Sequence, residues 1–354
     1  MKRVVLGLVG TACVAAGASS IQAQVEPEPL WAYAWSTQPK PGDKPAAQAP
    51  PTRDLRPNED PQEQTRPQTV QGSSAKYSLV GIRDGHNVID WFPGDHPVMS
   101  DIIKHGPASL EAERGRGCGS CHLPNGKGRP ENAPPAGQPA GYTLQQLRDF
   151  RDGTRYTSDP RKVNTPTMIA LAKAMTEDEM RQSAEYFAAM PWTPWMRVVE
   201  ADTIPEMHLE PGNMYVSTGS GKTESLAGRI VEAPEDEHQA NVLRNTHSGW
   251  VVYVPVGSLA RGRNLVTTGG GKTVGCATCH GTDLMGLADV PGIAGRSPSY
   301  MMRQLWDMKR GTRNGLWVEM MKPVIANLTA DEMTAIVAYL ASIKPSSPAP
   351  TSSQ

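Results

Sequence analysis

Two five-residue strings with the same spacing constrain this 354-residue chain more than any other feature: CGSCH at Cys118–His122 and CATCH at Cys276–His280. In each string two cysteines stand two residues apart, and a histidine directly follows the second. Three chemistries use cysteine pairs at this spacing: a four-cysteine zinc site, a pair of redox disulfides, and the covalent attachment of c-type haem. Of these, only haem attachment also requires the histidine.

The histidine after both pairs therefore favours covalent haem. Two thiols at this spacing can add to two vinyl groups of one haem, and the histidine then lies beneath the ring, where its imidazole binds the iron. We predict two covalently bound haem c groups, ligated by His122 and His280 and attached through Cys118, Cys121, Cys276 and Cys279. The fifth cysteine, Cys13, stands in an N-terminal leader, so no cysteine remains for a disulfide or a thiolate ligand.

The N-terminus has the pattern of an export signal. Lys2 and Arg3 precede an apolar run, and small residues follow it, which predicts a signal peptide over residues 1–23 and a periplasmic protein. A lipoprotein anchored at Cys13 is the alternative, although the preceding residues lack the usual leucine. No other stretch is apolar and long enough to span a membrane, so we expect no transmembrane anchor. The formal net charge of −1 gives no reason to expect a nucleic-acid partner.

Composition then divides the mature chain. Residues 24–76 are rich in proline and polar residues and are expected to form a disordered arm, as is the tail at 346–354. The apolar patch at 30–35 is the exception, and it is expected to pack on the body or on a partner. Between residues 192 and 257, β-rich runs at 229–231 and 250–254 predict a small strand-containing insertion.

An internal duplication defines the two larger parts. Cys118–Arg155 aligns with Cys276–Arg313 at a constant shift of 158 residues without gaps, and the shared positions include Tyr142 with Tyr300 and Arg155 with Arg313. A repeat of this length predicts two copies of one domain, at 77–191 and 258–345.

Both copies end in a helix with the same start signal. Thr176 and Thr329 are each followed three residues later by glutamate, which predicts capping boxes at the start of amphipathic helices. Short helices are also expected at 98–106 and 258–266, before each cysteine motif. The predicted fold is therefore mainly α-helical.

Methionine is the usual second axial ligand that raises the potential of an electron-transfer haem. Met168 lies eight residues before Thr176, and Met321 lies eight before Thr329, so both are predicted to occupy the loop that enters the final helix. Their matching positions make them the candidate iron ligands. Met175 and Met320 are competing methionines nearby.

Haem motif, loops, methionine and terminal helix together resemble a class I c-type cytochrome domain, and two of them in tandem resemble the di-haem cytochromes of the c4 kind. The resemblance covers roughly residues 98–190 and 258–343. It implies that the carbonyl groups of Pro134 and Pro291 accept hydrogen bonds from the haem histidines. It also implies that the haem propionates are bound by Tyr142, Arg155, Tyr300 and Arg313.

These features predict a periplasmic di-haem cytochrome that passes single electrons between redox proteins, such as a dehydrogenase, an oxidase or another cytochrome. One alternative is a di-haem enzyme of the thiosulfate dehydrogenase or peroxidase type, and another is the cytochrome subunit of a dehydrogenase. An enzyme would need an open iron position or a different ligand. The histidines outside the motifs that offer one are His86, His96, His105, His208, His238 and His247. His96 is the most interesting of them, because Asp90 and Asp95 stand close to it, although a structural role in a turn is the simpler interpretation.

Overall fold

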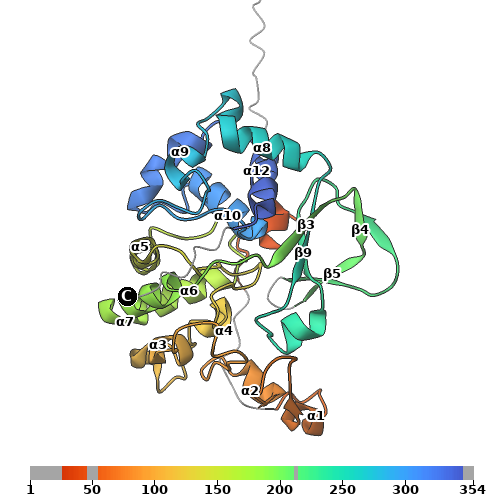
Figure 1. Cartoon of the computed structure of the whole chain (residues 1–354), viewed down its shortest axis with the longest axis vertical. Helices are drawn as coiled ribbons and strands as arrows, with labels where there is room; N and C mark the ends of the chain where they lie inside the picture. The colour runs from red at the N-terminus through yellow and green to blue at the C-terminus, as the bar shows by residue number, and fades with distance from the viewer. Residues whose placement is uncertain (1–25, 46–54, 211–213, 346–354) are drawn as a thin grey trace, which may run out of the picture.

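The structure, a computed structural model, describes residues 26–45, 55–210 and 214–345. The predicted signal peptide, Cys13 and the predicted tail at 346–354 lie outside the described residues. Figure 1 shows the two copies of the duplicated unit stacked along the long axis, with the strands beside them. In the described ranges, no helix combines the length and the apolar composition needed to cross a bilayer.

The first unit, which we call domain 1, is built around the helix that carries the first cysteine motif. Its helices are α3 (Asp101–Lys104), α4 (Gly119–His122), α5 (Ala140–Arg151), α6 (Asn164–Ala174) and α7 (Glu177–Ala188). The capping box at Thr176 and Glu179 is present, as predicted. Met168, however, lies within α6 rather than in a loop, and the helix expected over 98–106 spans only α3.

The second unit, domain 2, repeats this arrangement around the second motif. Its helices are α8 (Ser258–Thr268), α9 (Ala277–His280), α10 (Pro298–Lys309), α11 (Lys322–Ile325) and α12 (Ala330–Ser342). The predicted capping box at Thr329 and Glu332 starts α12. Helix α8 crosses α12 so closely that a β-carbon at Gly262 would overlap the carbonyl group of Ala335, which explains the glycine inside a helix.

The predicted strand-containing insertion lies between the two domains in sequence. Its strands are β3 (Met196–Glu200), β4 (Thr203–Pro205), β5 (Met207–Glu210), β6 (Met214–Ser217), β7 (Thr223–Ser225), β8 (Val231–Pro234) and β9 (Trp250–Val254). Strand β9 is central in a three-stranded sheet, parallel to β3 and antiparallel to β8. Because β9 is largely buried on both faces, its sequence is a continuous apolar run. The strand expected at 229–231 begins only at Val231.

The proline-rich arm is not disordered throughout, which corrects the prediction for residues 26–45 and 55–76. A short helix, η1 (Leu30–Tyr33), packs on α10 of domain 2. The hydroxyl group of Tyr33 donates to Asp307 at 2.6 Å, and Arg303 donates to the carbonyl oxygen of Ala32 at 2.6 Å. The apolar patch at 30–35 therefore packs on the body, because burial of its side chains offsets the cost of ordering the arm.

The chain before domain 1 forms a small structure with its own core. It contains α1 (Pro61–Thr65), β1 (Pro67–Gln68), β2 (Tyr77–Ser78) and α2 (Leu79–Arg83). Val70, Ile82 and Trp91 pack there against Leu243 of the insertion, and the indole nitrogen of Trp91 donates to the carbonyl oxygen of Leu243 at 2.8 Å. Residues 79–92 and 238–246 thus form one layer, which we call the cap.

Candidate haem sites

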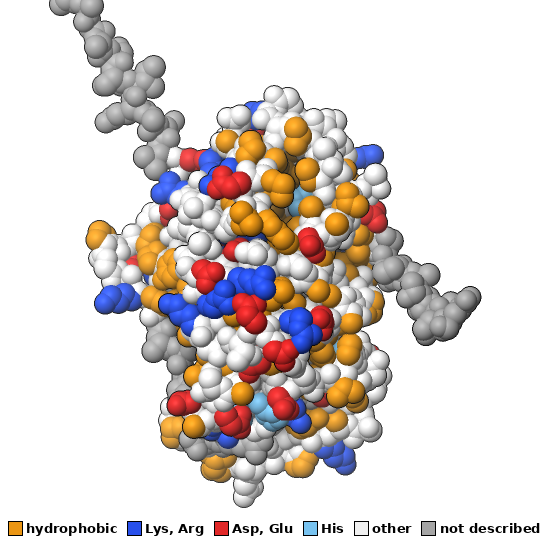
Figure 2. All heavy atoms as spheres, turned by 90° about the vertical axis from the view of Figure 1, so that its left-hand side faces the viewer, with side chains coloured by type: hydrophobic (Ala, Val, Ile, Leu, Met, Phe, Trp, Pro, Cys, Tyr) orange, Lys and Arg blue, Asp and Glu red, His pale blue; other side chains and the backbone are white. Residues whose placement is uncertain are grey.

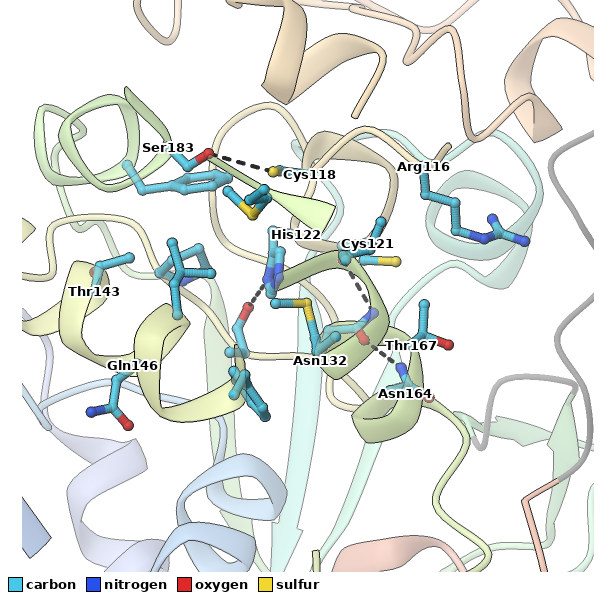
Figure 3. A pocket seen from close by; sticks show the side chains of 18 of the residues that line it. Arg116, Cys118, Cys121, His122, Asn132, Thr143, Gln146, Asn164, Thr167 and Ser183 are labelled. Atoms are coloured by element: carbon cyan, nitrogen blue, oxygen red, sulfur yellow. Dashed lines mark hydrogen bonds between the residues drawn. The ribbon is translucent and has the colours of Figure 1, made fainter. Parts of the chain in front are cut away.

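A cavity in domain 1 gathers the four residues that the first motif and its methionine predict. Cys121 and His122 line it from α4, Cys118 from the residue before α4, and Met168 from α6. Figure 3 shows both cysteines and the histidine at this pocket, with the sulfur of Cys118 directed toward Ser183. The hydroxyl group of Ser183 lies 3.7 Å from the sulfur of Cys118. Met168 therefore shares one apolar pocket with the residues of the first motif, although it lies 46 to 50 positions after them in the sequence.

The ring of His122 is held by a backbone carbonyl. Its Nδ1 lies 2.8 Å from the carbonyl oxygen of Ala133, and the edge of Phe187 packs near the ring. Burial lowers the pKa of His122, so the neutral imidazole is favoured, which is the form that binds metal. With Nδ1 engaged, Nε2 is the nitrogen available for iron.

Domain 2 repeats this arrangement in a larger cavity of about 460 Å³. Cys276, Cys279 and His280 line it from α9 and the residue before it, and Met321 lines it from the start of α11. Nδ1 of His280 lies 2.8 Å from the carbonyl oxygen of Pro291, and burial lowers the pKa of this histidine as well. The competing methionines Met175 and Met320 also line their respective cavities.

The prediction for Pro134 is wrong, because the carbonyl group of Ala133 contacts His122. Ala133 is the position equivalent to Pro291 at the shift of 158 residues, so position in the loop, rather than residue type, determines the acceptor. The carbonyl oxygen of Pro134 instead accepts from Nη1 of Arg296, at 2.7 Å. Arg296 belongs to domain 2, so this hydrogen bond joins the two domains.

A second interdomain connection mirrors the first. Gln138, the equivalent of Arg296, donates from Nε2 to the carbonyl oxygen of Gly292 at 2.9 Å and accepts from its backbone amide at 2.9 Å. Gly292 follows Pro291 directly, just as Pro134 follows Ala133. Each domain thus holds the loop that orients the histidine of the other. The sequence analysis missed both residues, although the gapless alignment pairs them.

The four residues expected to bind propionates meet between the domains. Nη2 of Arg313 donates to the hydroxyl group of Tyr142 at 3.0 Å, and Nη2 of Arg155 lies 3.4 Å from the hydroxyl group of Tyr300. Both arginines also donate to Gln146, at 3.0 and 2.9 Å. Each arginine therefore reaches the tyrosine of the other domain, an exchange that the sequence did not indicate.

Tyr142, Gln146 and Tyr300 line both cavities, so the two sites share a wall. Burial raises the pKa of Tyr142. Burial alone would also raise the pKa of Tyr300, but the charges of Arg155 and Arg313 outweigh it and lower this pKa. The shared wall is thus a buried, cationic strip that can stabilise carboxylates from either side.

The described residues do not form the zinc site that two cysteine pairs can also indicate. In the part of the chain that the structure describes, no group of three or more histidine, cysteine, aspartate or glutamate residues is placed to hold a metal ion. The two cysteine pairs open into separate cavities, so they do not form one zinc site. The histidines outside the motifs line neither cavity. His96 instead contacts Asp90 and the hydroxyl group of Tyr186.

The residues present fit a covalently held haem in each domain. Both cavities are largely apolar, and each offers two thiols beside a neutral imidazole and a thioether. Burial raises the pKa of the Cys118 and Cys276 thiols to about 11, so thiolate chemistry is disfavoured there. Haem supplies a one-electron iron couple when it is bound at such a site.

Comparisons with known proteins agree with this arrangement. The cytochrome c family model matches residues 111–191 and 259–344. A thiosulfate dehydrogenase electron acceptor of Stutzerimonas stutzeri is 38% identical over 229 residues, which cover 64% of this chain and 78% of the relative. Cytochrome c4 of Pseudomonas aeruginosa is 23% identical over 239 residues, covering 66% and 88%. The solved structure of Acidithiobacillus ferrooxidans cytochrome c4 is 20% identical, covers 64% of this chain and 98% of its own, and gives a TM-score of 0.42.

The chain belongs to the cytochrome c family and carries two class I cytochrome c domains in tandem. Its function is that of a di-haem electron-transfer cytochrome with covalently bound haem c.

Proposed function

We propose that this cytochrome accepts electrons from a thiosulfate-oxidising dehydrogenase in the periplasm and passes them to a second redox protein. The observation that carries the proposal is the pair of cavities with one shared wall, because transfer of electrons through the protein needs redox sites that lie close together. The names of the relatives from Stutzerimonas stutzeri and Thiomonas intermedia support the choice of donor.

Each cavity holds one haem in this proposal. Cys118 and Cys121 attach the first, with His122 and Met168 as iron ligands; Cys276 and Cys279 attach the second, with His280 and Met321. An iron held by an imidazole and a thioether would suit transfer of electrons rather than catalysis on a substrate. We also propose that residues 1–23 are a signal peptide, which directs export of the protein to the periplasm.

The shared wall receives the haem propionates. Arg155 and Arg313 provide fixed guanidinium groups, and Tyr142 and Tyr300 provide hydroxyl donors, so carboxylates from both cavities are stabilised in one buried strip. Because Tyr142 and Tyr300 line both cavities, haems held there would share this strip, and it would connect the two redox sites within the protein.

A rapid-mixing experiment tests the function. Oxidised holoprotein is mixed with purified thiosulfate dehydrogenase and thiosulfate, and the absorption of the haems is followed. We expect two haem equivalents to be reduced rapidly, and only when both the enzyme and thiosulfate are present. Reduction by thiosulfate alone would instead favour an enzyme, and no reduction under either condition would exclude this donor.

A further inference from the structure

The two domains differ at the entrance to their cavities. In domain 2, Val274, Leu287 and Met320 line the cavity, and yet they are 52%, 61% and 66% exposed, so they stand at its mouth. We call these three residues the apolar rim. Thr278 and Cys279 of the second motif are exposed beside it.

Domain 1 has polar residues at the same places. At the shift of 158 residues, Val274 corresponds to Arg116 and Leu287 to Arg129; at the shift of 153 that aligns the two methionine ligands, Met320 corresponds to Thr167. Arg129 is not at an open mouth, because it pairs with Glu131 at 2.5 Å and donates to Asn241 of the insertion at 3.3 Å. Three apolar positions of one copy are thus polar in the other.

The cap explains this difference. Arg244 of the cap donates to the carbonyl oxygen of Ser120, inside the first motif, and Asn125 donates to the carbonyl oxygen of Thr246 at 2.9 Å. The backbone amide of Gly117 donates to Gly85 on the other side of the motif. The attachment helix of domain 1 is therefore covered, whereas the described residues place no such layer over the motif of domain 2.

The lysines near the apolar rim are paired within the chain. Lys322, next to Met321, pairs with Glu319 at 2.5 Å, and Lys272, two residues before Val274, pairs with Glu332 at 2.7 Å. The exposed Asp289 also lines the cavity. Figure 2 shows the face of the molecule that carries α5, α7 and α9. On this face hydrophobic side chains are frequent at the height of domain 2, whereas a belt of charged side chains crosses the middle. On α5 and α7, Arg148 and Arg151 pair with Glu177, and Arg181 pairs with Asp178.

We infer that the apolar rim is the surface on which a redox partner docks, and that electrons cross the surface of this protein at domain 2. The partner is a redox protein whose own cofactor edge is surrounded by uncharged, apolar side chains, because three exposed apolar side chains with paired lysines beside them complement such a surface. This inference rests on the proposed electron-transfer function and names the surface at which electrons enter or leave the protein. Domain 1, beneath the cap, then exchanges electrons through the shared wall.

The test uses the full holoprotein and thiosulfate dehydrogenase as the probe. Leu287→Glu and Met320→Glu place a charge on the rim, and Val98→Glu is the matched control, since Val98 is 95% exposed and lines neither cavity. We expect each rim variant to lower the second-order rate constant of haem reduction about tenfold and to raise the Kd of the complex, measured by calorimetry, by a similar factor. The control keeps the rate constant and the Kd of the wild type, and the wild-type rate changes little with salt.

Several outcomes would overturn the inference. Unchanged rates in both rim variants, an equal loss in Val98→Glu, or a steep fall of the wild-type rate with salt would each contradict it. If the rim variants only convert a dimer to a monomer in sedimentation, with electron exchange unaltered, the occupant is a second copy of this chain. If the wild type takes no electrons from the dehydrogenase, the proposed donor is wrong; the same variants are then measured with a small blue-copper protein as acceptor, and the same tenfold loss is expected.

Discussion

The two domains carry the same attachment chemistry in different surroundings. In domain 1 the cysteine motif lies under the cap, and the half-buried Arg244 contacts it from outside. In domain 2, Thr278 and Cys279 of the equivalent motif are exposed, and exposed apolar side chains line the cavity. The gapless repeat therefore produces two similar sites, but segments outside the repeat determine how exposed each cysteine motif is. In this chain those segments are the N-terminal extension and the insertion.

The largest effect is expected from the candidate iron ligands. Met168→Ala and Met321→Ala each remove the thioether from one site, so one of the two haems should lose its sulfur–iron charge-transfer band. Its midpoint potential should fall by roughly 0.2 V or more, within the range of about 0.8 V that axial ligands cover. A spectroelectrochemical titration of the holoprotein measures both.

Neighbouring methionines provide the matched control. Met320→Leu and Met175→Leu keep the volume of a side chain that lines the same cavity, so both charge-transfer bands should remain. If Met320→Leu removes a band and Met321→Ala does not, the ligand in domain 2 is Met320.

Removal of a buried side chain of the cap tests whether the cap protects the first cysteine motif. The side chain of Trp91 is 2% exposed and hydrogen-bonded to Leu243, so Trp91→Ala should lower the free energy of unfolding by about 3–5 kcal/mol. Denaturant titration measures this loss. Hydrogen exchange should show faster exchange at α4 and unchanged protection at α9; equal changes at both helices would mean that the cap does not act on domain 1 specifically.

The interdomain contacts to the histidine loops differ in charge. Burial lowers the pKa of Arg296 to about 9, so it is still a cation at neutral pH, whereas its equivalent, Gln138, is neutral. A buried cation favours the reduced, less positive haem, so Arg296→Gln should lower the midpoint potentials by roughly 40 mV, which corresponds to ~1 kcal/mol for one electron. Arg296→Lys keeps the charge and should restore most of the potential; a lysine variant that behaves like glutamine would indicate a purely structural role.

The smallest effect is expected for His96, which connects the chain before domain 1 to α7 through its contact with the hydroxyl group of Tyr186. Its side chain is 3% exposed, and Nε2 lies 3.2 Å from Asp90. Burial alone lowers the pKa of His96, but hydrogen bonds with Asp90 and the carbonyl group of Pro97, together with the charges of Asp90 and Asp95, outweigh it and raise this pKa.

A group whose pKa is raised by folding stabilises the folded state below its unfolded pKa, and this contribution is lost as the pH rises through the folded value. The free energy of unfolding should therefore decline from about pH 6.5 upward by up to ~1 kcal/mol, and His96→Gln should abolish that part of the decline. A variant with the same pH profile as the wild type would exclude His96 as the cause.

The residues of the candidate haem sites could be predicted from the sequence more completely than the segments that surround them. Cys118, His122 and Met168 follow from local spacing and from register between the copies, because both are set by the chemistry of attachment and the repeat. The acceptor of His122 was misassigned to Pro134, since residue type was preferred to register. Gln138 and Arg296 could not be recognised as interdomain contacts, because only the packing of the two copies brings each to the other's loop.

The cap and the ordered arm were beyond sequence reasoning for a similar reason. Proline-rich composition predicts disorder when a segment is considered alone, but Tyr33 and Trp91 have hydrogen-bond partners more than a hundred residues away, Asp307 of α10 and Leu243 of the insertion. Burial against distant elements overrides local composition. Such contacts leave no periodic pattern in the sequence.

The most direct test of the account follows the order in which the two haems are reduced. In Met168→Ala the remaining charge-transfer band reports domain 2, and in Met321→Ala it reports domain 1, so each variant marks one haem. Oxidised samples are mixed with thiosulfate dehydrogenase and thiosulfate. The account predicts that the domain 2 band disappears as fast as in the wild type, and that the domain 1 band disappears at least about tenfold more slowly. Equal rates, or faster loss of the domain 1 band, would contradict entry through domain 2.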